Sequence, residues 1–182
     1  MTAVVDTLPR RRVTVLGSTG SVGCSTLDLI ERNRDRFAVE ALTAHRNVAL
    51  LAEQARRVRP RFVAVADPAL FGELKQSLAG SGIEVAAGPE AIVEAAQRPA
   101  EWVMAAIVGA AGLASTRAAA ERGAMVAFAN KECLVSAGPL LMERVRRNGA
   151  TLLPVDSEHN AIFQVLDTRA RDSVEKLILT GS

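Results

Sequence analysis

Apolar residues along this chain follow two patterns that alternate from one end to the other. Continuous apolar runs of about four to eight residues are typical of strands buried on both faces, and apolar residues three or four apart are typical of amphipathic helices. The continuous runs predict strands at 12–17, 37–44, 61–66, 83–85, 101–108, 125–129, 151–155 and 176–179. The helical spacing predicts helices at 20–30, 48–58, 67–78, 89–97, 113–122 and 140–147.

This alternation predicts an α/β fold with a doubly wound, mostly parallel sheet, because successive parallel strands need right-handed helical crossovers. We expect residues 1–11 to form a flexible arm, residues 12–150 a first domain and residues 151–182 the beginning of a second α/β domain. The last predicted strand runs into Thr180-Gly181-Ser182, a glycine turn that normally leads to another element. The second domain is therefore expected to be truncated.

Composition and charge narrow the range of functions. Apolar residues make up 49% and charged residues 23% of the 182 residues, which is ordinary for a folded globular protein. A net charge of +2 gives no reason to expect a nucleic acid or an anionic membrane as partner. Cys24 and Cys133 lack CxxC spacing, so the sequence encodes neither a disulfide framework nor a zinc site. Since the chain also has no signal peptide and no apolar run of about eighteen residues, we expect a cytoplasmic protein.

The segment from Gly17 to Gly23 has the pattern GxxGxxG and lies between a predicted strand and a predicted helix. The dinucleotide-binding fingerprint requires this context, because glycine lets the backbone approach a pyrophosphate and the helix N-terminus offers it free N–H groups. The alternative interpretation is a tight turn that needs small residues only for packing. The context favours a dinucleotide site.

The end of the second predicted strand bears on which dinucleotide is bound. NAD-binding proteins usually have an acidic residue there, which accepts hydrogen bonds from the ribose 2′-hydroxyl. This chain has Ala44-His45-Arg46-Asn47, and the Arg46 guanidinium would favour a 2′-phosphate. The sequence therefore predicts NADP rather than NAD, with a solvated loop arginine as the alternative.

Two carboxylates, Asp156 and Glu158, follow a predicted strand at the sheet edge where ligands bind in open parallel sheets. Residues two apart in an extended chain lie on the same face, so both could bind one cation. Oxygen ligands without a His-Cys cluster favour Mg²⁺ or Mn²⁺ over Zn²⁺. Alternatively, Asp156 or Ser157 could cap a helix. His159 could orient a metal ligand or bond to the backbone at a helix start.

Three strings of residues carry a resemblance to a known family. They are Gly17 to Asp28, Ala129-Asn130-Lys131-Glu132, and LPVDSEHNAIFQ at residues 153–164. Together they closely resemble the 1-deoxy-D-xylulose 5-phosphate reductoisomerase family, NADPH-dependent enzymes of the non-mevalonate route of isoprene biosynthesis. The resemblance implies a Rossmann-like NADPH-binding domain at 12–150, followed at 151–182 by the start of the catalytic domain that holds metal and substrate.

The resemblance also implies roles for individual residues. The residues expected to bind NADPH are Gly17, Thr19, Gly20, Ser21, Val22, His45, Arg46, Asn47, Asn130 and Glu132. Lys131, Ser157 and Glu158 would be catalytic, with Lys131 and Ser157 touching the substrate. Asp156 and Glu158 would bind the divalent cation, Mg²⁺ or Mn²⁺.

The implied reaction rearranges 1-deoxy-D-xylulose 5-phosphate to a branched aldehyde phosphate, which NADPH then reduces to 2-C-methyl-D-erythritol 4-phosphate. The cation would chelate the carbonyl and hydroxyl oxygens of this sugar phosphate and polarise them. Members of the family are generally homodimers, which implies a second copy of the chain as partner.

The chain departs from the family pattern at a few positions and in length. His45-Arg46 stands where glycine-lysine is common, and Cys133 stands where serine is usual. Family members are more than about twice as long and continue into a further metal ligand, a mobile loop, phosphate-binding residues and a helical domain. We therefore expect this chain alone to bind NADPH but not to turn over substrate.

Two other functions stay open at this point: a non-catalytic NADP-binding module and another Rossmann oxidoreductase. Extended short-chain dehydrogenases use a tyrosine as proton donor, and the chain contains no tyrosine. An aldehyde dehydrogenase acting through a thioester would need a reactive thiolate, whereas Cys133 is expected to be a small packing residue.

Overall fold

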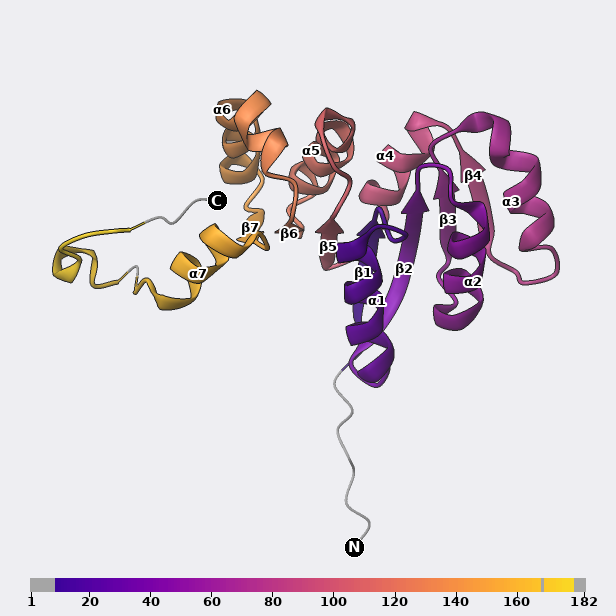
Figure 1. Ribbon diagram of the computed structural model, residues 1–182, viewed down its shortest axis with the longest axis horizontal. Coiled ribbons are helices and arrows are strands. Elements are labelled where there is room, and N and C mark those ends of the chain that lie inside the picture. The colour runs from indigo at the N-terminus through magenta and orange to yellow at the C-terminus, as the bar shows by residue number, and fades with distance from the viewer. Residues whose placement is uncertain (1–8, 168, 179–182) are drawn as a thin grey trace, which may run out of the picture.

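Within residues 9–167 and 169–178, which the computed structural model describes, seven parallel strands form a single sheet (Figure 1). The strands are β1 (Arg11–Leu16), β2 (Phe37–Ala44), β3 (Phe62–Val65), β4 (Glu84–Ala87), β5 (Trp102–Ala105), β6 (Met125–Phe128) and β7 (Thr151–Pro154). The α-helices are α1 (Ser21–Arg32), α2 (Val48–Val58), α3 (Phe71–Ser77), α4 (Pro89–Gln97), α5 (Leu113–Glu121), α6 (Lys131–Arg147) and α7 (Ser157–Val165). Short 3-10 helices are η1 (Pro68–Leu70), η2 (Ala110–Gly112) and η3 (Arg171–Ser173).

The strand order is β4-β3-β2-β1-β5-β6-β7, and every neighbouring pair is parallel. The chain therefore builds outward from β1 to β4, returns to place β5 beside β1, and then builds outward in the other direction. This confirms the predicted doubly wound sheet. The reversal opens a crevice between the carboxyl ends of β1 and β5, which is where ligands bind in such sheets.

Two apolar clusters cover the two faces of the sheet. Leu27 of α1, Leu51 of α2 and Leu74 of α3 belong to one cluster, and all three are fully buried. The opposite cluster is rich in alanine on α4 and α5, which contact each other: Ala91, Ala95, Ala96, Ala118, Ala119 and Ala120. Since alanine side chains are short, these two helices can approach closely.

The structure reproduces β2, α2 and α4 with the predicted bounds and shortens the strand predicted at 101–108. β5 ends at Ala105, and the backbone N–H of Ala106 makes the last bond of this edge, to the Leu16 carbonyl at 3.0 Å. One residue further on, the carbonyl of Ile107 accepts a hydrogen bond from the Asn130 side chain and not from a strand. Residues 106–108 therefore form a loop at the crevice.

The helix predicted at 140–147 begins much earlier, at Lys131. Asn130 caps it by accepting a hydrogen bond from the Cys133 N–H at 3.3 Å. A kink at Ala137, where φ is −145°, precedes Gly138-Pro139 and divides α6 into two helical pieces. The prediction was too short because Pro139 breaks the i to i−4 bonding only locally, and the helix resumes after it.

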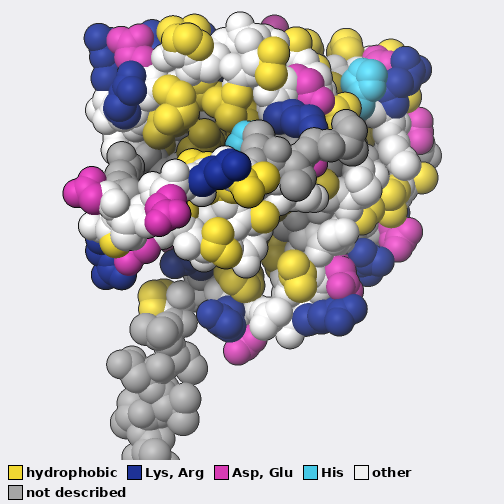
Figure 2. Space-filling model, turned by 60° about the vertical axis from the view of Figure 1, so that its left-hand side comes forward, with side chains coloured by type: hydrophobic (Ala, Val, Ile, Leu, Met, Phe, Trp, Pro, Cys, Tyr) yellow, Lys and Arg dark blue, Asp and Glu magenta, His cyan; other side chains and the backbone are white. Residues whose placement is uncertain are grey.

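The last part of the chain is less enclosed than the rest. β7 pairs with β6 in the same sheet, and α7 and the segment after it extend away from the sheet (Figure 1). The predicted strand at 176–179 is wrong for residues 176–178, which are irregular and exposed with no strand beside them; Leu179 lies outside the described residues. Figure 2 turns this end of the molecule forward and shows hydrophobic side chains exposed among charged ones.

The predicted arm at 1–11 is one residue too long, since Arg11 already belongs to β1. Residues 1–8 lie outside the described part of the chain. None of the described helices is both long and apolar enough to span a membrane.

Candidate functional site

A cavity of about 780 Å³ lies over the carboxyl ends of the strands, at the crevice between β1 and β5. Its lining comes from the carboxyl ends of strands, the loops that follow them and the starts of α4 and α5: Gly17, Thr19, Gly20, Ala44, His45, Ala66, Pro89, Glu90, Ile92, Val93, Ala106, Ile107, Val108, Ala111, Ala114 and Ser115. Most of these side chains are small or apolar. A cavity of this size and character is typical of a small-molecule or cofactor site.

The glycine turn, residues 17–23, forms the floor of the cavity beside β1. Gly17 has a φ of +81°, and a Cβ there would lie 2.9 Å from the Ala106 carbonyl oxygen. A Cβ on Gly23 would lie 2.3 Å from the Gly17 oxygen and 2.5 Å from the Ser18 Cα. Both positions therefore require glycine. Gly20 is the N-cap of α1 and makes no side-chain cap, so the first N–H groups of α1 stay available to a ligand.

At the end of β2, the three predicted cofactor residues make different contacts. His45 is exposed and lines the cavity. The Arg46 Nη1 lies 3.1 Å from Asp67 Oδ2, and the arginine side chain is 67% exposed. Asn47 caps α2 by accepting a hydrogen bond from the Leu50 N–H at 3.1 Å. Of these three residues, only His45 lines the cavity, while Arg46 is paired with Asp67.

The Asn130 side chain connects two loops at the sheet edge. It is 2% exposed and donates to the Ile107 and Gly109 carbonyls, the second at 2.8 Å. These bonds use both amide hydrogens of Asn130, so any ligand contact there would be made by another atom of the residue. Lys131 and Glu132 occupy the first turn of α6 and are exposed.

The carboxylates predicted to share one face of an extended chain lie in a different backbone geometry. Strand β7 ends at Pro154, Asp156 is the N-cap of α7, and Glu158 belongs to the first turn of that helix. The reasoning from extended-chain spacing was therefore wrong, and the capping interpretation of Asp156 is confirmed. Its Oδ1 accepts a hydrogen bond from the His159 N–H at 3.1 Å.

His159 also contacts Asp156 through its side chain, with 2.6 Å between Nδ1 and Oδ1. Burial acts to raise the pKa of Asp156, but the backbone and ring hydrogen bonds from His159 outweigh it and lower the pKa. Asp156 is therefore ionised at neutral pH and able to bind a cation. In the described residues, no cluster of three or more His, Cys, Asp or Glu side chains could hold a metal.

The register of the sheet brings the two groups of candidate polar residues to the same edge. Phe128, the last residue of β6, is opposite Pro154, the last residue of β7. Lys131 and Asp156 thus follow the ends of two adjacent parallel strands. Neighbouring strands in a sheet are about 4.8 Å apart. The glycine turn lies two strands away from β6, on the other side of β5.

Sequence reasoning missed most of the cavity walls. Ala66 follows β3, Pro89 and Glu90 begin α4, and Ser115 belongs to α5. The Gly88-Pro89 step, which lies between the strand predicted at 83–85 and the helix predicted at 89–97, was a usable signal for this edge of the sheet. Gln54, a buried residue of α2, belongs to no sequence motif.

Comparison with known protein families shows to which family the chain belongs. A family model described as 1-deoxy-D-xylulose 5-phosphate reductoisomerase matches residues 13–138. The chain belongs to this family. The model of the reductoisomerase C-terminal domain matches residues 152–182.

Individual relatives agree with this membership. The chain is 68% identical over 172 residues to the reductoisomerase of Rhodospirillum centenum, covering 94% of this chain and 43% of that one, and 61% identical over 175 residues to that of Rhizobium meliloti. The solved reductoisomerase of Zymomonas mobilis in complex with NADPH is 59% identical, with a TM-score of 0.88 over 91% of this chain and 44% of that one. A reductoisomerase solved with NADPH, fosmidomycin and magnesium is 40% identical, with a TM-score of 0.84 over 90% of this chain and 40% of that one. The chain thus spans less than half the length of these relatives.

Proposed function

We propose that residues 12–150 are the NADPH-binding unit of a 1-deoxy-D-xylulose 5-phosphate reductoisomerase, and that residues 151–182 begin its metal- and substrate-binding unit. The observation that carries this proposal is the glycine turn, residues 17–23, which opens onto the cavity at the point where the strand order reverses. The Zymomonas mobilis relative, solved with NADPH, supports the choice of ligand.

The turn is suited to the pyrophosphate of the cofactor. Gly17 and Gly20 keep the backbone accessible, and the N–H groups of Thr19, Ser21 and Val22 would donate to the phosphate oxygens, assisted by the positive end of the α1 dipole. NADPH, when bound there, supplies the hydride of the reaction.

The adenosine end of the cofactor would lie at the end of β2. His45 lines the cavity there, and Asn47 holds the start of α2 in place. Arg46 would bind the 2′-phosphate by exchanging its bond to Asp67 for one to the phosphate. At the other side of β5, Asn130 holds the loop at 107–109, and Glu132 would contact the cofactor further along.

The cation would bind at the start of α7. Asp156 and Glu158 supply carboxylate oxygens, which suit Mg²⁺ or Mn²⁺, and two ligands leave most coordination positions to water and substrate. The cation, when bound, polarises the carbonyl and hydroxyl oxygens of the sugar phosphate. A relative solved with magnesium supports this assignment.

The proposed reaction of the whole protein is the conversion of 1-deoxy-D-xylulose 5-phosphate to 2-C-methyl-D-erythritol 4-phosphate. Lys131 at the start of α6 and Ser157 at the start of α7 would hold the substrate between adjacent strand ends, with Glu158 beside them. We expect the 182-residue polypeptide by itself to bind NADPH without turnover, because these residues do not complete either the metal site or a phosphate site.

We also propose a cytoplasmic location and a homodimeric state for the protein. Cys24 and Cys133 are both free thiols, which fits a reducing cytoplasm. A second copy of the chain is the proposed partner, and sedimentation of the purified protein would show whether a homodimer forms.

A calorimetric titration with NADPH, and with NADH for comparison, at fixed Mg²⁺ tests the cofactor assignment. We expect NADPH to bind more tightly, because only NADPH carries the 2′-phosphate that Arg46 would bind. Equal or tighter binding of NADH would overturn the assignment of NADP. Absence of binding to a chain shown by circular dichroism to be folded would overturn the proposed nucleotide unit.

A further inference from the structure

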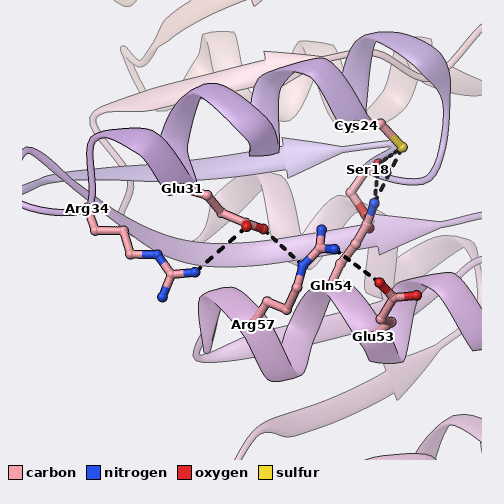
Figure 3. Close-up of polar contacts among 7 residues, drawn as sticks. All are labelled: Ser18, Cys24, Glu31, Arg34, Glu53, Gln54 and Arg57. Carbon is pink, nitrogen blue, oxygen red and sulfur yellow. Dashed lines mark hydrogen bonds and ion pairs between the residues drawn. The ribbon is translucent and has the colours of Figure 1, made fainter.

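Gln54 is a polar residue in the middle of α2 whose side chain is only 1% exposed. An amide left without hydrogen-bond partners at such a position would be destabilising. The amide is bonded, and within the described residues its partners are on the segment that begins at the glycine turn (Figure 3). The residue therefore connects α2 to the floor of the cavity, 36 residues earlier in the sequence.

Ser18 takes part in two of these bonds, once as acceptor and once as donor. Gln54 Nε2 donates to the Ser18 carbonyl at 2.9 Å, and the Ser18 hydroxyl donates to Gln54 Oε1 at 2.7 Å. The second amide hydrogen points toward Cys24 Sγ on α1, at 3.6 Å. One buried side chain thus holds the main chain and the side chain of Ser18 together with the first turn of α1.

Strand β2 holds Ser18 from the opposite direction. The Ser18 N–H donates to the Thr43 carbonyl at 2.8 Å, and the Gly17 N–H donates to Thr43 Oγ1 at 2.9 Å. With its N–H bonded to β2 and its carbonyl to α2, the Ser18 peptide groups cannot rotate. This orientation determines where the next N–H groups, those of Thr19 to Val22, are directed.

We propose that Gln54 is a positioning residue for NADPH binding: it fixes Ser18 so that the N–H groups of the following turn face the pyrophosphate. It touches no part of the cofactor and acts through Ser18. The proposal rests on the proposed function for its ligand, but the effect on the turn exists without any ligand. Prior fixing of the turn removes an entropic cost that binding would otherwise carry.

Gln54→Met is the main test, because methionine has a similar shape and cannot form the two bonds to Ser18. We expect the Kd for NADPH to rise about tenfold, because a turn that Gln54 no longer fixes must be ordered when the cofactor binds. In the ligand-free protein, we expect hydrogen exchange of the Thr19 to Val22 amides to speed up more than that of the β1 amides.

Two control variants separate positioning from general loss of stability. Arg57→Met breaks a different contact between α1 and α2, the surface pair of Arg57 with Glu31 at 3.1 Å (Figure 3). Leu74→Ala, on α3, opens a cavity in the apolar cluster to which α1 and α2 also contribute. Both should leave the Kd for NADPH within about twofold of the parent, even where Leu74→Ala lowers the thermal midpoint as much as Gln54→Met.

Ser18→Ala tests the same bond from the other side and serves if Gln54→Met does not fold. It should weaken NADPH binding by less than Gln54→Met, and the double variant should lose less than the sum of the two. An unchanged Kd together with unchanged exchange of the turn amides in Gln54→Met or Ser18→Ala would overturn the proposal. If the parent itself binds no NADPH, the proposed function fails, and the exchange comparison alone decides whether Gln54 fixes the turn.

Discussion

The glycine turn and the carboxylate segment at 156–159 both follow the carboxyl end of a strand, yet they are held in different ways. Ser18, Thr43 and Gln54 around the turn are each no more than 1% exposed, and their bonds join three elements. The helix α7, by contrast, has no buried residue, and the side-chain hydrogen bonds of its first half span six residues or fewer.

This difference indicates what each region needs from the rest of the protein. The turn is fixed by long-range contacts inside the described chain, so it should be ready to bind its ligand. The carboxylate segment is fixed only by its own cap, and the exposed apolar residues nearby, including Phe163 and Val165, have no cover among the described residues. We therefore expect the nucleotide site to be much closer to completion than the metal site.

Gly23→Ala should break the turn most severely. The added Cβ would lie 2.3 Å and 2.5 Å from backbone atoms that cannot move cheaply, so we expect a loss of about 3 kcal/mol or more in unfolding free energy and no measurable NADPH binding. Urea unfolding and calorimetry would measure these effects. Gly72→Ala is the matched control, since a Cβ there would meet no atom within 4 Å apart from its own helix backbone and chain neighbours, and stability should be equal or higher by up to about 1 kcal/mol.

Asn130→Ala should cost about 1 to 3 kcal/mol, because it removes the Asn130 amide donor from the partly buried carbonyls of Ile107 and Gly109 and removes the cap of α6. Urea denaturation would measure the loss. Asn148→Ala, at the exposed opposite end of the same helix, should change stability by about 0.5 kcal/mol or less. Equal losses in the two variants would contradict the role of Asn130 as a link between loops.

Arg46→Ala should sharpen the contrast within the nucleotide site itself, because the Arg46 side chain is exposed whereas the polar residues around the glycine turn are buried. We expect the Kd for NADPH to rise about tenfold and the Kd for NADH to stay the same, since only the 2′-phosphate loses a charged partner. Calorimetry would compare both cofactors, with Arg56→Ala as an exposed-arginine control on α2. A similar loss for NADPH and NADH would contradict this assignment.

Asp156→Asn should separate the metal role of Asp156 from its structural one. Asparagine caps a helix about as well as aspartate, so stability should change by less than about 0.5 kcal/mol while binding of Mn²⁺, already weak in this chain, becomes undetectable. Asp156→Ala should also lose about 1 kcal/mol from the missing cap. Electron paramagnetic resonance of Mn²⁺ and thermal unfolding would measure the two effects, and unchanged Mn²⁺ binding in Asp156→Asn would contradict the metal assignment.

Replacement of Cys133 should have the smallest effect, a change in the stability of the protein at alkaline pH. Burial, and then the nearby Glu132 charge, raise the pKa of this thiol above its ordinary value of 9.0. The folded state therefore favours the protonated thiol, a contribution that is complete below about pH 9 and is lost as the pH rises through the higher folded pKa. The urea midpoint should fall more between pH 9 and about 10.5 in the parent than in Cys133→Ser. Cys24→Ser, which retains Cys133, should follow the parent.

The order and type of most elements could be predicted from the sequence, because burial in a parallel sheet produces continuous apolar runs and amphipathic helices produce their own spacing. The exact bounds of β2, α2 and α4 followed from this pattern. The predictions failed where a side-chain hydrogen bond was involved. Asn130 bonds the Ile107 carbonyl just beyond the end of β5, where the strand was predicted to continue. Asp156 caps a helix that begins in a segment expected to be extended.

The amino-acid sequence by itself determined the fold class, the glycine turn and the family, since these depend on local pattern and on short, specific strings of residues. The tertiary structure alone decided which polar groups meet: Gln54 with Ser18, Asn130 with Ile107, and Arg46 with Asp67. Local pattern carries no signal for such pairs, because each depends on how the crossovers place elements that are about twenty to forty residues apart.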